Sequence, residues 1–513
     1  MNKEKNITTN DIMLAQDTLT LYKRQKLGLE KRLAEEENIW SSVYSDGESS
    51  SWIFNSIVNK HADIIDSIPT CTCLPREKRD ERDAAMLSKI IPVISQRCEF
   101  EQTYSDNAWS KLKHGTSIFG VFWNNAMEGG MGDVDIRGID VKDVFWDMSV
   151  SDVQSSKNLF IIAPVDIEEA EARYPHFKYA EHKDADQHLI TNLALQPGDG
   201  KALSVDWYYK KYLGDGSSVL HYCKFIGDCV LYSSENDPAC ANGWYEHGKY
   251  PIVFDRMYPM GSAYGFGLIA IATNAQKYIN RLDANMLEYT DWASRVRFWA
   301  KRSLGVNEKE FLDLERSIVE VEGDIDEEKL RQIEISPIDD TVIDIKRLKI
   351  EELKEITGAR DVSQGGVTGG VTAASAISIL REAGAKSSRD GIEETYRAYV
   401  KIISLVIELV RQFYDETRIF RIVGEDGKPE YIEFSGKNLR DDGTGRRPFF
   451  DIEINAMKKS PTEAQQKNQF AKALYDSGAF KKENIKETLM MLELMDFEGV
   501  GNLKVSLRSE YGE

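Results

Sequence analysis

The spacing of apolar residues predicts a helical N-terminal part. Residues 9–40 follow a charged helical pattern, and residues 52–68 place isoleucines near one face of a second helix. Two more helices are predicted at residues 80–94 and 100–114, and Gly115 stands where a glycine cap would end the last one. In the first helix four leucines fall on a loose stripe: Leu14, Leu21, Leu29 and Leu33.

After residue 117 the apolar period falls to two, which predicts strands. Ile118–Trp123 is expected to pair with Val134–Ile139. A meander is expected next, with strands at residues 205–213, 219–226 and 230–232. A smaller hairpin is expected at residues 419–423 and 431–434, turned by Asp426–Gly427.

The rest of the pattern is helical. Helices are predicted at residues 268–292, 337–356, 372–417, 461–475 and 482–495, with a small α/β piece at residues 304–335. In the longest helix one apolar face indicates core packing rather than a subunit contact, and it comprises Ile392, Tyr396, Tyr399, Ile403, Val406, Val410 and Phe413. Gly384 and Gly391 would either kink this helix or divide it, with Ser388 or Asp390 capping the second part.

One segment, between Val362 and Leu380, has no charged residue, although 29% of the chain is Asp, Glu, Lys or Arg. Its glycines allow almost any backbone shape. The segment is therefore either a mobile neutral surface along which a polyanion slides or a flexible hinge. It has the glycine spacing of a phosphate-binding loop, but Val371 takes the lysine position, so nucleotide binding is not expected.

Composition limits the class of function. The chain has 513 residues, enough for two or three domains, and its net charge of −20 argues against tight nonspecific binding of nucleic acid. The six cysteines lack the paired spacing of a zinc site, so we expect them to be reduced and mostly buried in a cytoplasmic setting. Neither a signal peptide nor a membrane-spanning segment is expected.

A cluster of aspartates raises the alternative of a metal-dependent nuclease or hydrolase. Its members are Asp133, Asp135, Asp140, Asp143, Asp147 and Asp152. However, no lysine or histidine stands at a suitable distance to complete a cleavage site, and the seven histidines are isolated. An acidic rim on a solvated sheet explains the cluster better, and we expect no metal and no other cofactor.

The order of the predicted elements resembles that of the portal (head-to-tail connector) proteins of tailed bacteriophages, over residues 40–495. Leu74–Arg76, taken as a polar link before a charged helix, resembles the family's N-terminal helical region. His114–Gly115 before a strand, followed by Val144–Asp147, resembles the entry to its β-rich wing. A third landmark resembles the start of a helical crown: Lys459–Thr462 with Gln465 and Gln469.

The resemblance implies an α+β fold, a portal-like ring subunit with a β-rich wing, a two-helix stem, a small α/β clip, a long wing helix and a helical C-terminal crown. The implied divisions are the N-terminal helical part of the wing (1–115), the β-rich wing (116–265), stem helix 1 (266–293), the clip (294–336), stem helix 2 (337–358), the tunnel loop (359–374), the long wing helix and β-hairpin (375–457) and the crown-like region (458–513).

The implied function is that of a ring, commonly of twelve copies, at one vertex of the capsid. Double-stranded DNA would pass through its channel without sequence specificity during packaging and ejection. The implied partners are the terminase large subunit, which supplies the motor, the head-completion or adaptor proteins, and the major capsid or scaffolding protein. The ring would assemble in the host cytoplasm, without a membrane, and remain in the virion, and the chain would not be an enzyme.

Three groups of site residues follow from the resemblance. The tunnel loop would line the DNA channel with Gln364, Gly365, Gly366, Val367, Thr368, Gly369, Gly370 and Thr372. Nearby channel cations would be Lys346, Arg347, Lys349 and Arg360, unless they form a solvated helix face offset by Glu351, Glu352 and Glu355. The clip would dock the motor or adaptor through Arg295, Arg297, Trp299, Lys301 and Arg302, unless these residues form a subunit contact.

A different shell or tail component is the remaining alternative. An adaptor would be much shorter than this chain, and a major shell protein would lack a helix pair around a small insertion. Both comparisons favour the portal interpretation.

Overall fold

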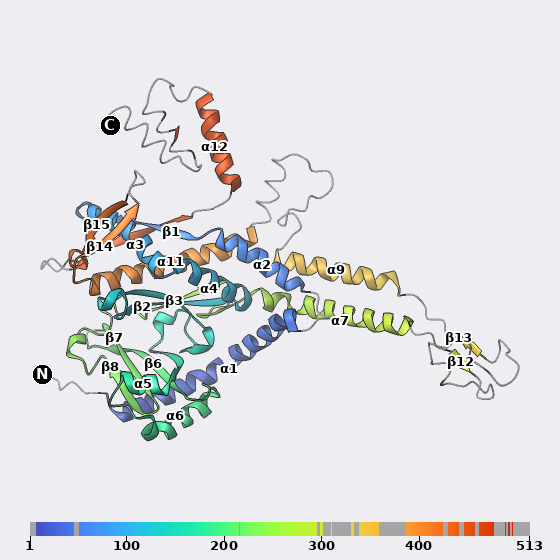
Figure 1. The fold of residues 1–513 in the computed structure, drawn as a ribbon, viewed down its shortest axis with the longest axis horizontal. Helices are drawn as coiled ribbons and strands as arrows, with labels where there is room; N and C mark the ends of the chain where they lie inside the picture. The colour runs from blue at the N-terminus through green and yellow to red at the C-terminus, as the bar shows by residue number, and fades with distance from the viewer. Residues whose placement is uncertain are drawn as a thin grey trace. The chain divides into compact units, whose positions relative to one another are not determined.

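The structure, drawn as a ribbon in Figure 1, is a computed structural model. It falls into two compact units. It describes residues 7–45, 51–214, 216–294, 298–300, 309, 330–332, 338–358, 386–423, 429–440, 446–456, 461–476, 488, 491–492 and 495. Unit 1 comprises Met1–Glu37, Ile57–Ala270 and Asp361–Glu513. Unit 2 comprises Asn38–Ser56 and Ile271–Arg360.

Helices carry much of both units. Those with residues in both are α1 (Thr9–Ser45), α2 (Trp52–Ile65) and α7 (Leu268–Ser294). Unit 1 also has α3 (Glu81–Arg97), α4 (Phe100–His114), α5 (Ile167–Arg173), α6 (Tyr179–Leu193), α11 (Lys386–Phe413) and α12 (Pro461–Asp476), and unit 2 has α9 (Asp340–Thr357). The short 3-10 helices are η1 (Lys78–Asp80), η2 (Glu128–Gly130), η3 (Val141–Asp143), η4 (Val153–Ser155), η5 (Pro238–Cys240) and η7 (Gly436–Leu439).

The described sheets of unit 1 are antiparallel. The largest is a meander in the order β4 (Val144–Trp146), β5 (Asn158–Asp166), β6 (Lys201–Tyr212), β7 (Ser218–Ile226) and β8 (Cys229–Ser233). A three-stranded sheet has β2 (Thr116–Asn124) between β3 (Asp133–Ile139) and β9 (Ile252–Arg256). Two-stranded pairs join β1 (Pro69–Pro75) to β16 (Phe450–Ala456), β10 (Tyr258–Pro259) to β11 (Gly265–Phe266), and β14 (Arg418–Val423) to β15 (Pro429–Phe434).

The N-terminal helix α1 covers the meander through a stripe that differs from the predicted one. Ile12, Leu19 and Tyr22 pack with Phe160 and Phe225 in one buried cluster. Of the loose leucine stripe, Leu14 and Leu21 are 66% and 52% exposed, whereas Leu29 and Leu33 are buried. The helix instead buries isoleucine, alanine and tyrosine at a spacing of three or four residues.

Several local predictions are confirmed. The helices of the N-terminal part, the strand pair β2–β3, the meander β6–β8 and the hairpin β14–β15 lie where the pattern placed them, within a few residues. Gly115 ends α4 in the left-handed region, with φ of 80°. A Cβ atom at this position would lie 1.9 Å from the backbone carbon of Phe266, so only glycine fits the approach of these two segments.

The apolar face predicted for the long helix packs inside unit 1, as expected. Ile403, Val406 and Val410 are each at most 1% exposed. The expected helix start at residue 372 lies outside the described residues, and α11 runs from Lys386 without interruption through Gly391. Ser388 and Asp390 therefore lie inside the helix and do not cap it. Gly384, the turn at Asp426–Gly427 and most of residues 482–495 lie outside the described residues.

Some elements escaped the sequence analysis. Leu74 and Pro75, taken as a polar link, belong to strand β1 and stand opposite Asp451 and Phe450 of β16. Strands β5, β9 and β16 and helices α5 and α6 were not predicted either. Two of these strands pair with distant parts of the chain, β9 with β2 and β16 with β1.

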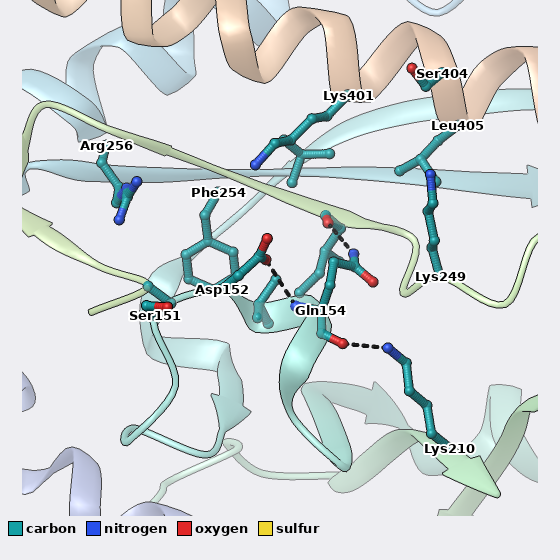
Figure 2. Close-up of a pocket in the computed structure, with 14 residues that line it drawn as sticks. Ser151, Asp152, Gln154, Lys210, Lys249, Phe254, Arg256, Lys401, Ser404 and Leu405 are labelled. Atoms are coloured by element: carbon teal, nitrogen blue, oxygen red, sulfur yellow. Dashed lines mark hydrogen bonds between the residues drawn. The ribbon is translucent and has the colours of Figure 1, made fainter. Parts of the chain in front are cut away.

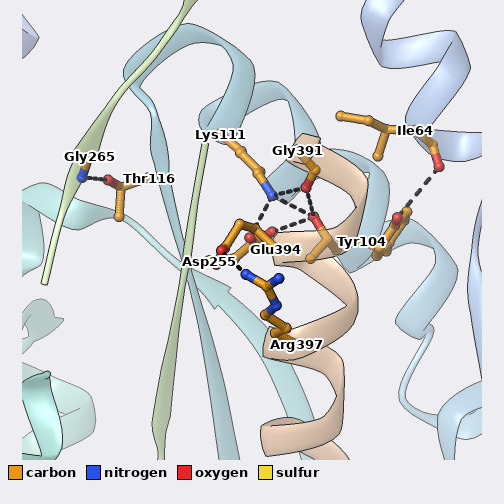
Figure 3. Close-up of polar contacts among 10 residues, drawn as sticks. Ile64, Tyr104, Lys111, Thr116, Asp255, Gly265, Gly391, Glu394 and Arg397 are labelled. Carbon is orange, nitrogen blue, oxygen red and sulfur yellow. Dashed lines mark hydrogen bonds and ion pairs between the residues drawn. The ribbon is translucent and has the colours of Figure 1, made fainter. Parts of the chain in front are cut away.

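A buried ion pair ties three elements of unit 1 together (Figure 3). Lys111 of α4 donates from Nζ to Asp255 Oδ1 of β9 at 2.6 Å and to the Gly391 carbonyl of α11 at 2.8 Å. Thr395 of α11 donates to the second Asp255 oxygen at 2.9 Å. Burial raises the pKa of Asp255, while the charge of Lys111 acts in the opposite direction. Because Lys111 and Asp255 are only 1% and 3% exposed, each depends on the other for compensation.

A second buried lysine fixes α1 to the edge of the meander. Lys26 is fully buried, and its Nζ donates to the carbonyls of Val141, Lys142 and Val144 at 2.6, 2.8 and 2.7 Å. The same nitrogen lies 4.2 Å from the centre of the Phe145 ring. Three acceptors and an aromatic face thus replace the water that this side chain loses on folding.

The cysteine prediction is confirmed in part. All six cysteines are free; Cys71, Cys73 and Cys223 are buried, and the other three are half-buried. Within the residues that the structure describes, no helix is both long enough and apolar enough to cross a membrane.

Candidate functional site: the helix pair of unit 2

Helices α7 and α9 of unit 2 lie side by side and run in opposite directions (Figure 1). Lys346 of α9 forms an ion pair with Asp283 of α7. Three residues later on α9, Lys349 Nζ lies 5.4 Å from the ring centre of Tyr278, which precedes Asp283 on α7. The contacts move backward along one helix as they move forward along the other, so the pair is antiparallel.

The first turn of α2 contacts both helices at the same end of unit 2. The Ile53 amide donates to Gln276 Oε1 of α7 at 3.2 Å. Thr357 of α9 donates to the Ser56 hydroxyl at 3.2 Å. Ser56, Gln276 and Thr357 are all at most 5% exposed. These hydrogen bonds therefore join α2 to both helices away from water, where they are stronger than at the surface.

A small hairpin stands between the two helices in the chain. Strand β12 (Phe298–Ala300) pairs antiparallel with β13 (Leu330–Gln332), and Trp299 stands opposite Arg331. The order helix, hairpin, helix is therefore present at residues 268–357. Of the predicted clip residues, the structure gives only the backbone of Trp299, and Arg295, Arg297, Lys301 and Arg302 lie outside the described residues.

The candidate channel cations on α9 each face a carboxylate. Lys346 pairs with Asp283, and Lys349 Nζ lies 2.6 Å from Glu352 Oε2. Arg347, whose side chain is 74% exposed, lies 3.8 Å from Asp344. The expected offset by Glu352 is thus present, whereas the partners Asp283 and Asp344 were missed. Arg360 and the whole tunnel loop, Gln364–Thr372, lie outside the described residues.

Helix α9 also has an exposed apolar stripe that was not predicted. Ile345, Leu348 and Ile356 are 43%, 62% and 42% exposed. Their spacings of three and eight residues put them on one helix face, because 3.6 residues make a turn. The signal was present in the sequence as apolar residues at helical spacing, but it does not say whether the face is buried within the chain.

The aspartate cluster serves local structure. Asp140 and Asp152 accept hydrogen bonds from backbone amides two residues on, which caps η3 and η4. Asp133 is 1% exposed and accepts a hydrogen bond from Tyr414, with Arg97 and Arg418 beside it, so it does not lie on a solvated rim as expected. In the described part of the chain, no group of three or more His, Cys, Asp or Glu could hold a metal ion.

These observations define a class of protein: a mixed α+β chain with antiparallel sheets, in which two antiparallel helices flank a small hairpin. The model of the phage P22-like portal protein family matches residues 55–219 and 216–512, so the chain belongs to that family. It is a structural component of the phage virion and not an enzyme, and the predicted resemblance to portal proteins is confirmed. No curated protein matches the chain.

Membership removes both alternatives from the sequence analysis. The nuclease or hydrolase hypothesis is wrong, and so is the hypothesis of a different shell or tail component. The family implies an oligomeric ring, the passage of DNA and a place at a capsid vertex.

Proposed function

We propose that twelve copies of this chain form a ring at one capsid vertex and that DNA passes through it during packaging and ejection. The family match over residues 55–512 carries this proposal. In it, α7 and α9 are the stem helices, residues 294–336 are the clip, and residues 359–374 form the tunnel loop at the narrowest point. The N-terminal helical part, the β-rich regions and α11 form the wing, and residues 458–513 begin a crown.

The charges of α9 suit a channel that guides DNA without gripping it. A free lysine ring would hold phosphates by releasing counterions, and each contact would have to break at every step. Here Lys346, Arg347 and Lys349 already have carboxylate neighbours. A DNA phosphate that contacts one of these cations therefore has to displace a carboxylate, which weakens the contact. Twelve copies at −20 give a ring charge of roughly −240, which adds a repulsive background.

The partners in this proposal are those that a portal ring requires. The terminase large subunit would dock on the clip, with Arg295, Arg297, Trp299, Lys301 and Arg302 as the docking surface. Head-completion or adaptor proteins would replace the motor there after packaging, and the capsid or scaffolding protein would surround the ring.

The exposed stripe on α9 supports assembly. Ile345, Leu348 and Ile356 would lose water against a neighbouring stem helix in a ring, which offsets part of the entropy that association costs. Purified protein should therefore form rings with an axial hole in size-exclusion chromatography and negative-stain images. A steady monomer across the accessible concentration range would contradict the proposal.

Bulky residues in the tunnel loop should impair DNA handling without affecting assembly. With Gly366→Leu and Gly369→Leu together, we expect intact rings and a several-fold loss of packaged DNA, because the larger side chains narrow the bore and restrict the backbone. The measurements are ring yield in images and DNA retained in assembled heads. Gly214→Leu is the matched control, since a Cβ atom there meets nothing within 4 Å. Loss of ring assembly in the double variant would show instead that the loop is structural.

A further inference from the structure

A cavity in unit 1 has a strongly positive lining (Figure 2). It has a volume of about 430 Å³ and lies between α11, β9, η4 and β6. Four cations from separate parts of the chain line it, against the single carboxylate of Asp152: Lys210, Lys249, Arg256 and Lys401. In a chain with net charge −20, such a concentration of cations is a local exception.

Two of these cations are held in place and two are available. Lys210 donates to the Gln154 carbonyl and lies 4.7 Å from the centre of the Tyr250 ring, and burial lowers its pKa. Arg256 donates to the Ser262 carbonyl at 2.8 Å. Lys249 and Lys401 are exposed and, among the residues that the structure describes, have no carboxylate within ion-pair distance. Their ammonium groups are free to meet an anion at the cavity mouth.

A second cavity in the same unit has the opposite character. It has a volume of about 740 Å³ and is lined by residues of β1, α3, α4 and α11. No lysine or arginine is among its lining residues, whereas Glu99 and Glu101 at the start of α4 are. Both glutamates are exposed and lack an ion-pair partner in the described part of the chain. This cavity therefore presents two uncompensated negative charges.

The two cavities lie on opposite sides of α11. Lys401, Ser404 and Leu405 line the positive cavity, and Tyr399 lines the negative one. Tyr399 stands two positions before Lys401, which places the two side chains about 200° apart around the helix at 3.6 residues per turn. Each copy thus carries two different charged surfaces, separated by one helix.

We propose that the negative edge of one copy, Glu99 and Glu101, docks against the positive cavity of the next copy through Lys249 and Lys401. This inference rests on the ring of the proposed function. A ring requires two different, complementary surfaces on each copy, because its interface is head-to-tail. Copies with net charge −20 repel one another, so opposite charges at the contact set the register and the direction of association.

The test exchanges the charges at each surface. Variant A carries Lys249→Glu and Lys401→Glu, and variant B carries Glu99→Lys and Glu101→Lys. Each alone places like charges at every contact and should lower the ring population at least about tenfold. Ring and monomer are quantified by size-exclusion chromatography with light scattering and by negative stain, at low and at high salt. Thermal melting of each monomer checks that it is folded.

Two combinations should restore assembly. The fourfold variant has both surfaces reversed, so its contacts are attractive again. A mixture of A and B should also form rings with alternating copies, because each contact then joins a positive surface to a negative one. The matched control is Lys183→Glu on α6, which is exposed and lines neither cavity, and it should assemble like the wild type.

The outcomes separate this inference from the proposed function. If A and B form rings as readily as the wild type, or if neither combination restores assembly, the inference is overturned while the ring stands. If the wild type itself forms no ring, the proposed function fails first. Loss in A and B, with recovery in the fourfold variant and in the mixture, supports the inference.

Discussion

Replacing Lys111 with methionine is expected to lower the free energy of unfolding by about 3–5 kcal/mol, because it leaves the Asp255 carboxylate buried without its counter-ion. The lost contacts are those to Asp255 at 2.6 Å and to the Gly391 carbonyl at 2.8 Å. Since these join α4, β9 and α11, the loss should affect unit 1 as a whole. Urea denaturation of the monomeric variant, followed by tryptophan fluorescence, measures it.

The control for this prediction is Lys89→Met on α3. Lys89 also pairs with a carboxylate, Glu430 at 3.7 Å, but both side chains are about half exposed. Such a surface pair contributes at most about 1 kcal/mol. The double variant Lys111→Met with Asp255→Leu should recover part of the lost stability, because no buried charge then remains unpaired. A single Lys111→Met variant as stable as Lys89→Met would contradict the role given to the pair.

Local periodicity accounts for the elements that the sequence predicted well. The face of α11 from Ile403 to Val410 repeats at helical spacing, and β2 is a short apolar run that starts after a glycine cap. Each signal lies within one segment, so no knowledge of the partner is needed. The two ion pairs within α9 can be predicted in the same way, because in each pair the two residues are three positions apart on one helix.

Pairings across the chain could not be predicted in this way. Strand β1 begins and ends with proline, which is unusual for a strand. It pairs with β16, which lies most of the chain length further along the sequence. Only the alternation of Cys71 and Cys73 with threonine hinted at a strand, and both thiols are buried. The Lys346–Asp283 pair likewise needs α7 and α9 to be antiparallel, which the sequence alone does not state.

Charged residues were the hardest to interpret. The aspartates after β2 suggested a metal site or a solvated rim, yet Asp133 is buried between Tyr414, Arg97 and Arg418. Its partners come from three other segments, so sequence proximity to the remaining aspartates was misleading. The positive cavity shows the same limit, because its cations stand on three separate segments and no motif groups them.

Lys26 interrupts the apolar stripe of α1, and this interruption is visible in the sequence. It stands between Tyr22 and Leu29 on the buried stripe of α1, where an apolar residue is expected. Replacing it with methionine should lower the free energy of unfolding by about 2–4 kcal/mol, because three buried carbonyls lose their donor. Lys31→Met, at an exposed position on the same helix, is the control and should change stability by less than about 0.5 kcal/mol.

The pH dependence of the Lys26 variant distinguishes this role from simple packing. Burial lowers the pKa of Lys26 from 10.5 to about 7, with the Glu30 carboxylate acting in the opposite direction. Between these two values the unfolded chain binds more protons at this site than the folded one. The stability contributed by Lys26 therefore rises with pH through that window, by at most about 1.4 kcal/mol per pH unit. Urea titrations at several pH values should show the gap between wild type and Lys26→Met widening from about pH 7 to about pH 9. A gap that narrows over this range would mean that the carbonyls hold the charged form more strongly than burial disfavours it.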